Sequence, residues 1–419
     1  MTHRPSITRD SAARGKTAAT AYCLVFAVGL VILLAANALA SPRFSAGLVQ
    51  ETTQGSAQDK AQNKTEDTAK EQQAHQLVQQ LSADKFQIRE QASRELAAFG
   101  MSAAAALKSG IESGDAEVRA RCLLILRDIT KRDFQARLQQ FKADLDGTSG
   151  YGLPGFDIYA ESIGNTRAAR ELYADMLETT PGLMHAITPN SDELSSAVDQ
   201  QIDAILNYDA SIMDSPQRMA SLLFASSLDG VSCETTTLSM ISFVTQTRPF
   251  GELARGPHAE VCHKIMDKWL GYNYASAPTE ECLRLALEYK LPAGMPLAKS
   301  VAVDKSAKPT ERMYAILAVA QLGDATHIPM LQKLFDAREV TRAYTLTNGQ
   351  WEAQLRDIAL ASVLYLAGED PKDFGFVNCA RSDITLFRPD TLSFAGERER
   401  QMAFAKYHAR FGQTDGNGN

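Results

Sequence analysis

The stretch "IREQASRELAAFG", residues 88–100, has the pattern of one amphipathic helix that ends at a glycine. Its apolar residues Ala92, Leu96 and Phe99 stand at intervals of four and three residues, which places them on one face of an α-helix. Gly100 follows directly, and glycine is common just after the end of a helix. The stretch therefore predicts a helix that buries one face against a neighbour.

The same design recurs at three further arginines. Counting from each arginine, a small residue follows at the third position, and apolar residues follow at the seventh and tenth. The four arginines are Arg89, Arg119, Arg312 and Arg356. The residues at the three offsets are Ala92, Leu96 and Phe99; Cys122, Leu126 and Ile129; Ala315, Val319 and Leu322; and Ala359, Val363 and Leu366. A design that recurs at fixed offsets predicts a repeat architecture.

A second helical segment follows two of these helices. "MSAAAALKSGIES", residues 101–113, follows the first copy, and "IPMLQKLFDA", residues 328–337, follows the third. Helix pairs of this kind stack on one another, because one pair cannot bury its own apolar face. The sequence therefore predicts an all-α fold, an α-α superhelix (α-solenoid) with an irregular helical middle.

The run "DKFQIREQASRELAAFG" followed by "AAAALKSGIESGDAEVRARCLLIL" resembles tandem HEAT-like repeats, with an Asp near the turn and an Ile-Arg or Val-Arg pair after it. The resemblance covers residues 75–130 and, less closely, residues 309–370. The chain is also similar to exported bacterial proteins in which such repeats follow an N-terminal apolar segment.

This resemblance implies an armadillo-type helical fold, which usually provides a protein-binding surface and has no shared catalytic residues. In the HEAT-like family the turn Asp and the Arg are structural. The resemblance therefore implies that Asp84, Arg89, Asp115 and Arg119 are not site residues.

Residues 147–305 depart from the repeat pattern. The Gly-rich "GTSGYGLPGF", residues 147–156, lacks the Lys-Ser/Thr ending of a phosphate-binding loop, and we interpret it as a flexible joint between helical blocks. The segments beyond it have helical periodicity, and only "ETTTLSMISFV", residues 234–244, shows some strand-like alternation. We interpret this middle region as degenerate helical pairs.

The N-terminus holds an uncharged apolar segment, "AYCLVFAVGLVILLAANALA", residues 21–40, after a basic, polar start. The segment ends in the small-x-small pattern of a signal-peptidase site, at Ala38-Leu39-Ala40. It is also ~20 residues long, which is enough to span a bilayer. A cleaved signal peptide and a retained N-terminal membrane anchor both remain open, and both place the rest of the chain outside the cytoplasm.

The changes of pattern along the chain predict six parts. Residues 41–72 are poor in large apolar side chains and rich in polar ones, which predicts disorder. The expected parts are a signal peptide or membrane anchor (1–40), a disordered tether (41–72), N-terminal HEAT-like repeats (73–146), a degenerate helical-pair region (147–305), C-terminal HEAT-like repeats (306–370), and a C-terminal helical extension with a tail (371–419).

The segment "HAEVCH", residues 258–263, is the one candidate for metal chemistry. His-Ala-Glu opens the zinc deaminase signature, but that site also needs a Pro-Cys-x-x-Cys motif, and no two cysteines of the chain are three residues apart. His258 and Cys262 stand one helical turn apart, and two ligands are too few for a structural metal site. We therefore expect no metal site, with Cys262 packed as a small apolar residue, and a metal-dependent site near His258 and Cys262 stays an alternative.

Five cysteines follow the apolar segment: Cys122, Cys233, Cys262, Cys282 and Cys379. An exported chain can form disulfides, and Cys262 with Cys282 is the pair to test. We favour five packed thiols, because the number is odd and Cys122 lies on the apolar face of a repeat.

Trp351 follows the turn signal Asn348-Gly349 in "LTNGQWEAQ". We expect it at the start of a helix. There it can anchor a partner or be buried against the neighbouring repeat, and we favour burial.

The formal net charge of −7 disfavours nucleic acid as a partner, because binding to phosphates needs a basic surface. The preferred function is a noncatalytic HEAT-like scaffold outside the cytoplasm that binds a protein of unknown identity on a helical-repeat surface. We expect no catalytic residue and no cofactor, and contact with a membrane only through residues 21–40 if they are uncleaved. Two alternatives stay open: a structural part of an envelope assembly formed by self-association, and an enzyme with a site in residues 147–305.

Overall fold

The computed structural model describes residues 69–188, 192–206, 215–346 and 349–412. Most of these residues are helical, and the strands form two short two-stranded sheets. The expectation of a mainly helical protein is confirmed, and the superhelix stays a prediction.

The chain divides into two compact units, Met1–Ala136 (unit 1) and Arg137–Asn419 (unit 2). The predicted apolar segment, residues 21–40, lies outside the described residues.

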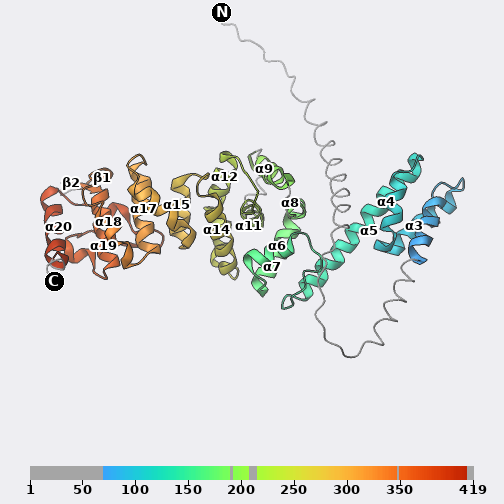
Figure 1. The fold of residues 1–419 in the computed structure, drawn as a ribbon, viewed down its shortest axis with the longest axis horizontal. Helices are drawn as coiled ribbons and strands as arrows, with labels where there is room; N and C mark the ends of the chain where they lie inside the picture. The colour runs from blue at the N-terminus through green and yellow to red at the C-terminus, as the bar shows by residue number, and fades with distance from the viewer. Residues whose placement is uncertain (1–68, 189–191, 207–214, 347–348, 413–419) are drawn as a thin grey trace, which may run out of the picture. The chain divides into compact units, whose positions relative to one another are not determined.

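Unit 1 consists of short helices packed around one apolar core (Figure 1). Its elements are a helix over residues 69–80, α3 (Phe86–Phe99), the 3-10 turn η1 (Gly100–Ala103), α4 (Ala104–Ile111) and the first part of α5 (Ala116–Ala143). The first helix already covers residues 69–72, where the sequence predicted a tether. In the two copies that begin at Arg89 and Arg119, the spacing predicted buried residues at fixed offsets. The core contains five of them: Ala92, Leu96, Cys122, Leu126 and Ile129.

Arg89 and Arg119 make the same contacts thirty residues apart. Nη1 of Arg89 donates to the carbonyl oxygens of the residues six and five positions before it, at 2.8 and 3.0 Å. Nη1 of Arg119 donates to the carbonyls at the same two offsets, both at 2.8 Å. Each arginine therefore holds the turn that leads into its own helix, which is a structural role.

Arg312 and Arg356 do not make these contacts, although the residues at their third and seventh offsets are buried. Nε of Arg312 donates to the carbonyl of Ala302, ten residues earlier, at 3.2 Å, and its guanidinium pairs with Glu339. Nε of Arg356 donates to the side chain of Gln354 at 2.6 Å. The two C-terminal copies therefore share the buried positions of the design and differ in the role of the arginine.

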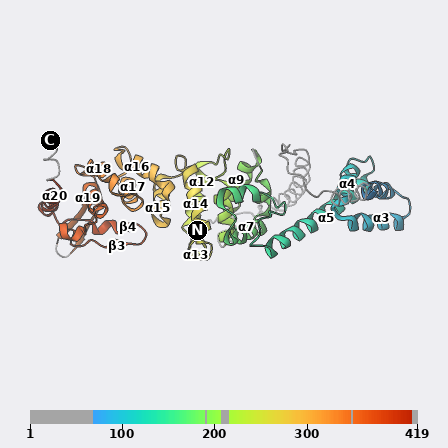
Figure 2. The same ribbon diagram turned by 60° about the horizontal axis from the view of Figure 1, so that its bottom comes forward.

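The helices of unit 2 follow one another in chain order in both views (Figures 1 and 2). Helix α17 packs against α15, α16 and α19, and α14 packs against α11 and α13. The helices are α6 (Phe156–Ile163), α7 (Arg167–Thr179), α8 (Pro181–Ala186), α9 (Asp192–Leu206), α11 (Pro216–Ala225), α12 (Thr235–Thr245), α13 (Arg248–Arg255), α14 (Ala259–Asn273), α15 (Thr279–Tyr289), α16 (Met295–Val303), α17 (Pro309–Leu322), α18 (Ile328–Gln332), α19 (Leu355–Leu366) and α20 (Glu397–Phe411).

The Gly-rich segment 147–156 belongs to unit 2, and the boundary between the units falls inside helix α5. Arg170 fixes the start of this segment, because its Nη2 donates to the carbonyls of Asp144 and Ser149 at 3.0 and 2.9 Å. The buried Arg170 guanidinium also lies 4.0 Å from the ring centroid of Phe141. These contacts hold the start of the segment, which connects α5 to α6, and the flexible joint between helical blocks stays an interpretation.

Residues 235–245 form helix α12, so the strand-like alternation of that stretch was misleading. The buried residues Leu238, Ile241 and Val244 are spaced by three, as on one face of a helix. The run of threonines at the start supplied the strand-like appearance, because β-branched residues favour strands only weakly and in context.

A β-hairpin precedes α19, where the sequence predicted only a turn and a helix. Strand β1 (Val340–Leu346) pairs antiparallel with β2 (Gly349–Gln354), and Trp351 lies in β2 opposite Tyr344. Helix α19 begins at Leu355, so Trp351 was wrongly expected at a helix start. Its expected burial is confirmed, since the residue is 7% exposed.

Candidate interaction surface

Helix α14 carries the residues that suggested a metal site, and they point to different neighbours. His258 precedes the helix, and its Nδ1 lies 3.2 Å from the carbonyl oxygen of Ala168. Cys262 is buried, and burial raises the pKa of its thiol to about 12. A thiol with that pKa is protonated at neutral pH.

The other two members of the motif are also engaged elsewhere. Glu260 forms an exposed ion pair with Lys264 at 3.0 Å, and the ring of His263 packs edge-on against Tyr289 at 5.6 Å between centroids. Among the described residues, no group of three or more His, Cys, Asp or Glu side chains is placed to hold a metal ion. The motif therefore does not assemble into a site.

All five cysteines after the apolar segment are free thiols, so the suggested bond between Cys262 and Cys282 is not formed. Burial raises the pKa of Cys122 and Cys379 to about 11 and that of Cys282 to about 12. These thiols act as small apolar side chains of the core.

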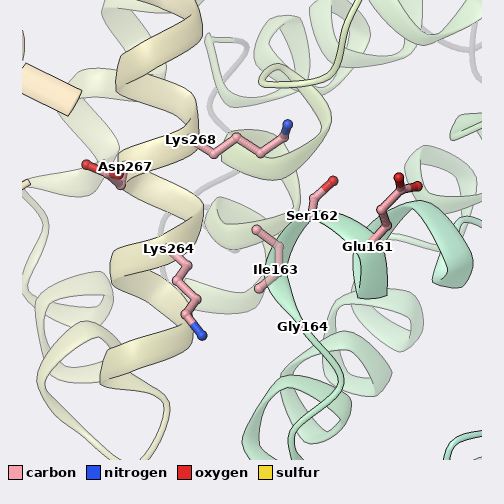
Figure 3. A pocket seen from close by; sticks show the side chains of 7 residues that line it. All are labelled: Glu161, Ser162, Ile163, Gly164, Lys264, Asp267 and Lys268. Atoms are coloured by element: carbon pink, nitrogen blue, oxygen red, sulfur yellow. The ribbon is translucent and has the colours of Figure 1, made fainter. Parts of the chain in front are cut away.

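A shallow groove of about 530 Å³ lies between the end of α6 and helix α14 (Figure 3). Lys264 and Lys268 reach toward Ser162 and Gly164 from α14, and Glu161 lies beside them. Lys264 is already paired within its own helix. Positive and negative side chains therefore both line this groove.

A polar network with a buried centre, which sequence reasoning missed, joins α19, α20 and β2. Nε of Arg400 donates to Oδ1 of the fully buried Asp357 at 2.8 Å, and the backbone N–H of Gln354 donates to the other carboxylate oxygen at 2.8 Å. The carboxylate of Glu397 accepts from both Arg400 and Arg356, at 2.8 and 2.6 Å. Every charge in this network has a partner, so the network holds the last helix in place.

Helix α5 carries exposed apolar side chains on the face opposite the unit 1 core. Cys122, Ile125 and Leu126 are buried, whereas Leu123 and Leu124 are 39% and 55% exposed. Five consecutive apolar residues, 122–126, cover more of a helix than one buried face requires. That run is the sequence signal for an exposed apolar surface, and the repeat pattern alone does not indicate it.

No protein-family model matches the chain, and no curated protein matches its sequence.

Proposed function

We propose that this protein is a noncatalytic helical scaffold outside the cytoplasm that binds another protein on the surface of unit 1. The observation that carries the proposal is the exposure of Leu123 and Leu124 on a helix whose opposite face is part of the core. Burying an exposed leucine against a partner contributes roughly 25 cal/mol per Å² of apolar surface removed from water. This helix surface therefore gains stability when a partner covers it.

The shared contacts of Arg89 and Arg119 support a scaffold of repeated helical units. A repeat whose outer helix stays uncovered leaves its apolar side chains in water, and further repeats or partner proteins cover such faces in α-solenoids. The HEAT-like pattern of residues 75–130 fits this use. The repeated contacts and the HEAT-like pattern are what support the scaffold proposal.

The proposal includes export of the chain from the cytoplasm. This part rests on the uncharged apolar segment, residues 21–40. None of the helices in the described part of the chain is both long and apolar enough to cross a bilayer. Fractionation of cells that produce the full chain with a C-terminal tag tests export directly. Recovery of the tag in the cytoplasmic fraction alone would remove the extracytoplasmic part of the proposal.

The binding function is tested by mild cross-linking of the tagged full chain in its native cells, followed by affinity purification and mass spectrometry. We expect one other protein in an amount close to that of the chain. Cross-linked species that contain only this chain would favour the self-associating envelope component instead. Recovery of the uncross-linked chain alone would contradict both.

A further inference from the structure

We infer that the partner presents an acidic amphipathic helix to one strip along α5, formed by Ala120, Leu123, Leu124, Arg127 and Lys131 (the α5 strip). This inference rests on the proposed binding function and adds the chemistry of the partner. All five residues are exposed and belong to unit 1.

The spacing of the α5 strip is that of a seam between two helices. Ala120, Leu124, Arg127 and Lys131 follow one another at intervals of four, three and four residues. Side chains at these intervals form one line along a helix and meet a second helix laid beside it. Ala120 is small, so a partner helix can approach closely at that end, where Leu123 widens the apolar part of the strip.

The positive charges of the α5 strip indicate that the partner's contact surface is negatively charged. The side chains of Arg127 and Lys131 have no hydrogen-bond or ion-pair partner among the residues of the described ranges. Their neighbours on the same helix are paired: Arg121 with Glu90 at 2.7 Å, and Arg132 with Asp128 at 2.9 Å.

Two cations one turn apart on a helix repel each other. An acidic partner residue opposite each cation removes that repulsion. Desolvation of the neighbouring leucines by the partner also strengthens the new ion pairs relative to pairs in open water. The apolar end and the cationic end of the strip thus call for a helix that is apolar at one end of its contact line and acidic at the other.

The test uses the purified full chain and a fluorescent synthetic helical peptide whose contact line carries leucines at one end and glutamates at the other. A matched peptide has lysine in place of every glutamate, and a third has the glutamate peptide's composition in scrambled order. We expect the glutamate peptide to bind at least tenfold more tightly than the other two. Equal binding of the three peptides, or no binding of the glutamate peptide, would overturn the inference.

Charge reversal locates the site. The double variant Arg127→Glu with Lys131→Glu should reverse the order of the glutamate and lysine peptides. The matched control is Lys333→Glu with Arg338→Glu, which changes one exposed lysine and one exposed arginine of unit 2 and should leave the order as in the wild type. An unchanged order in the α5 variant would show that the peptide binds elsewhere.

The apolar part is tested with Leu124→Asp, and Leu206→Asp in unit 2 is the control because that leucine is 44% exposed. We expect at least a tenfold loss of affinity in the first variant and none in the second. If the chain associates with itself and Leu124→Asp abolishes that association, the α5 strip binds a second copy of the chain. That result would overturn the inference.

Binding to vesicles with anionic lipid in preference to the glutamate peptide would also overturn the inference. If instead a captured protein forms cross-links only outside residues 116–136, the acidic-helix inference fails and the binding function stands.

Discussion

Nε of Arg400 donates to Oδ1 of Asp357 at 2.8 Å, and the two side chains are 4% and 0% exposed. This ion pair joins the last helix to α19 across 43 residues of sequence. Removal of one partner from a buried pair leaves an uncompensated charge in the core, and that is strongly destabilising. The docking of α20 therefore depends on a contact that is local in space and distant in sequence.

We predict that Arg400→Ala lowers the free energy of unfolding of unit 2 by about 3–5 kcal/mol. Arg388→Ala is the control, because its ion pair with Asp390 is exposed, and it should cost less than about 1 kcal/mol. Urea unfolding of the full chain, with hydrogen exchange to assign the transition, measures both. Equal effects of the two substitutions would show that the buried pair contributes no more than a surface pair.

Burial raises the pKa of Asp357 to about 6, even though Arg400 lowers it. The folded-state pKa then exceeds that of the unfolded chain, which lies near 4. Stability from this group is fully present below about pH 4 and is lost as the pH rises through about 6. We predict that Asp357→Asn removes this part of the pH dependence in unfolding titrations from pH 4 to 7. Identical pH profiles of the variant and the wild type would contradict the prediction.

Arg89→Ala should destabilise unit 1 by about 1–3 kcal/mol, because it removes two hydrogen bonds to turn carbonyls and an ion pair with Glu117. Arg94→Ala is the matched control, since Arg94 lies exposed on the same helix and should change stability by less than about 0.5 kcal/mol. Thermal unfolding followed by circular dichroism compares them. An unchanged melting temperature in Arg89→Ala would refute the structural role of this arginine.

Leu96→Asp should unfold unit 1 while unit 2 stays folded, because Leu96 is fully buried in the core of unit 1. Leu124→Asp places the same side chain on the exposed face and should leave unit 1 folded. Hydrogen exchange of backbone amides in residues 86–130 distinguishes the two variants. Full protection of these amides in Leu96→Asp would show that the helical register is wrong.

The helical period of unit 1 could be predicted from the sequence because its core is local. The interval of three and four residues between apolar side chains placed Ala92, Leu96, Cys122 and Leu126 in the core, and the structure confirms all four. In unit 1, contacts form mainly between helices that are neighbours in the sequence. A repeating pattern along the sequence therefore shows most of the residues that form the core.

The C-terminal part could not be predicted in the same way. The hairpin around Trp351 was missed because the alternation of its two strands is short, although Asn-Gly between two strands is a strong hairpin signal. The network of Asp357 and Arg400 needs residues that no local pattern connects. The run of residues 122–126 was visible as an excess of apolar side chains. The lack of side-chain partners for Arg127 and Lys131 among the described residues required the three-dimensional neighbours.

The most direct test is quantitative capture from native cells with three tagged full chains: wild type, Leu124→Asp and Leu206→Asp. The proposed function and the α5 strip together predict one partner in near-equal amount with the wild type and with Leu206→Asp, and its loss with Leu124→Asp. Equal recovery with all three chains would place the partner elsewhere on the molecule. Recovery of the wild-type chain without any partner would contradict the scaffold function itself.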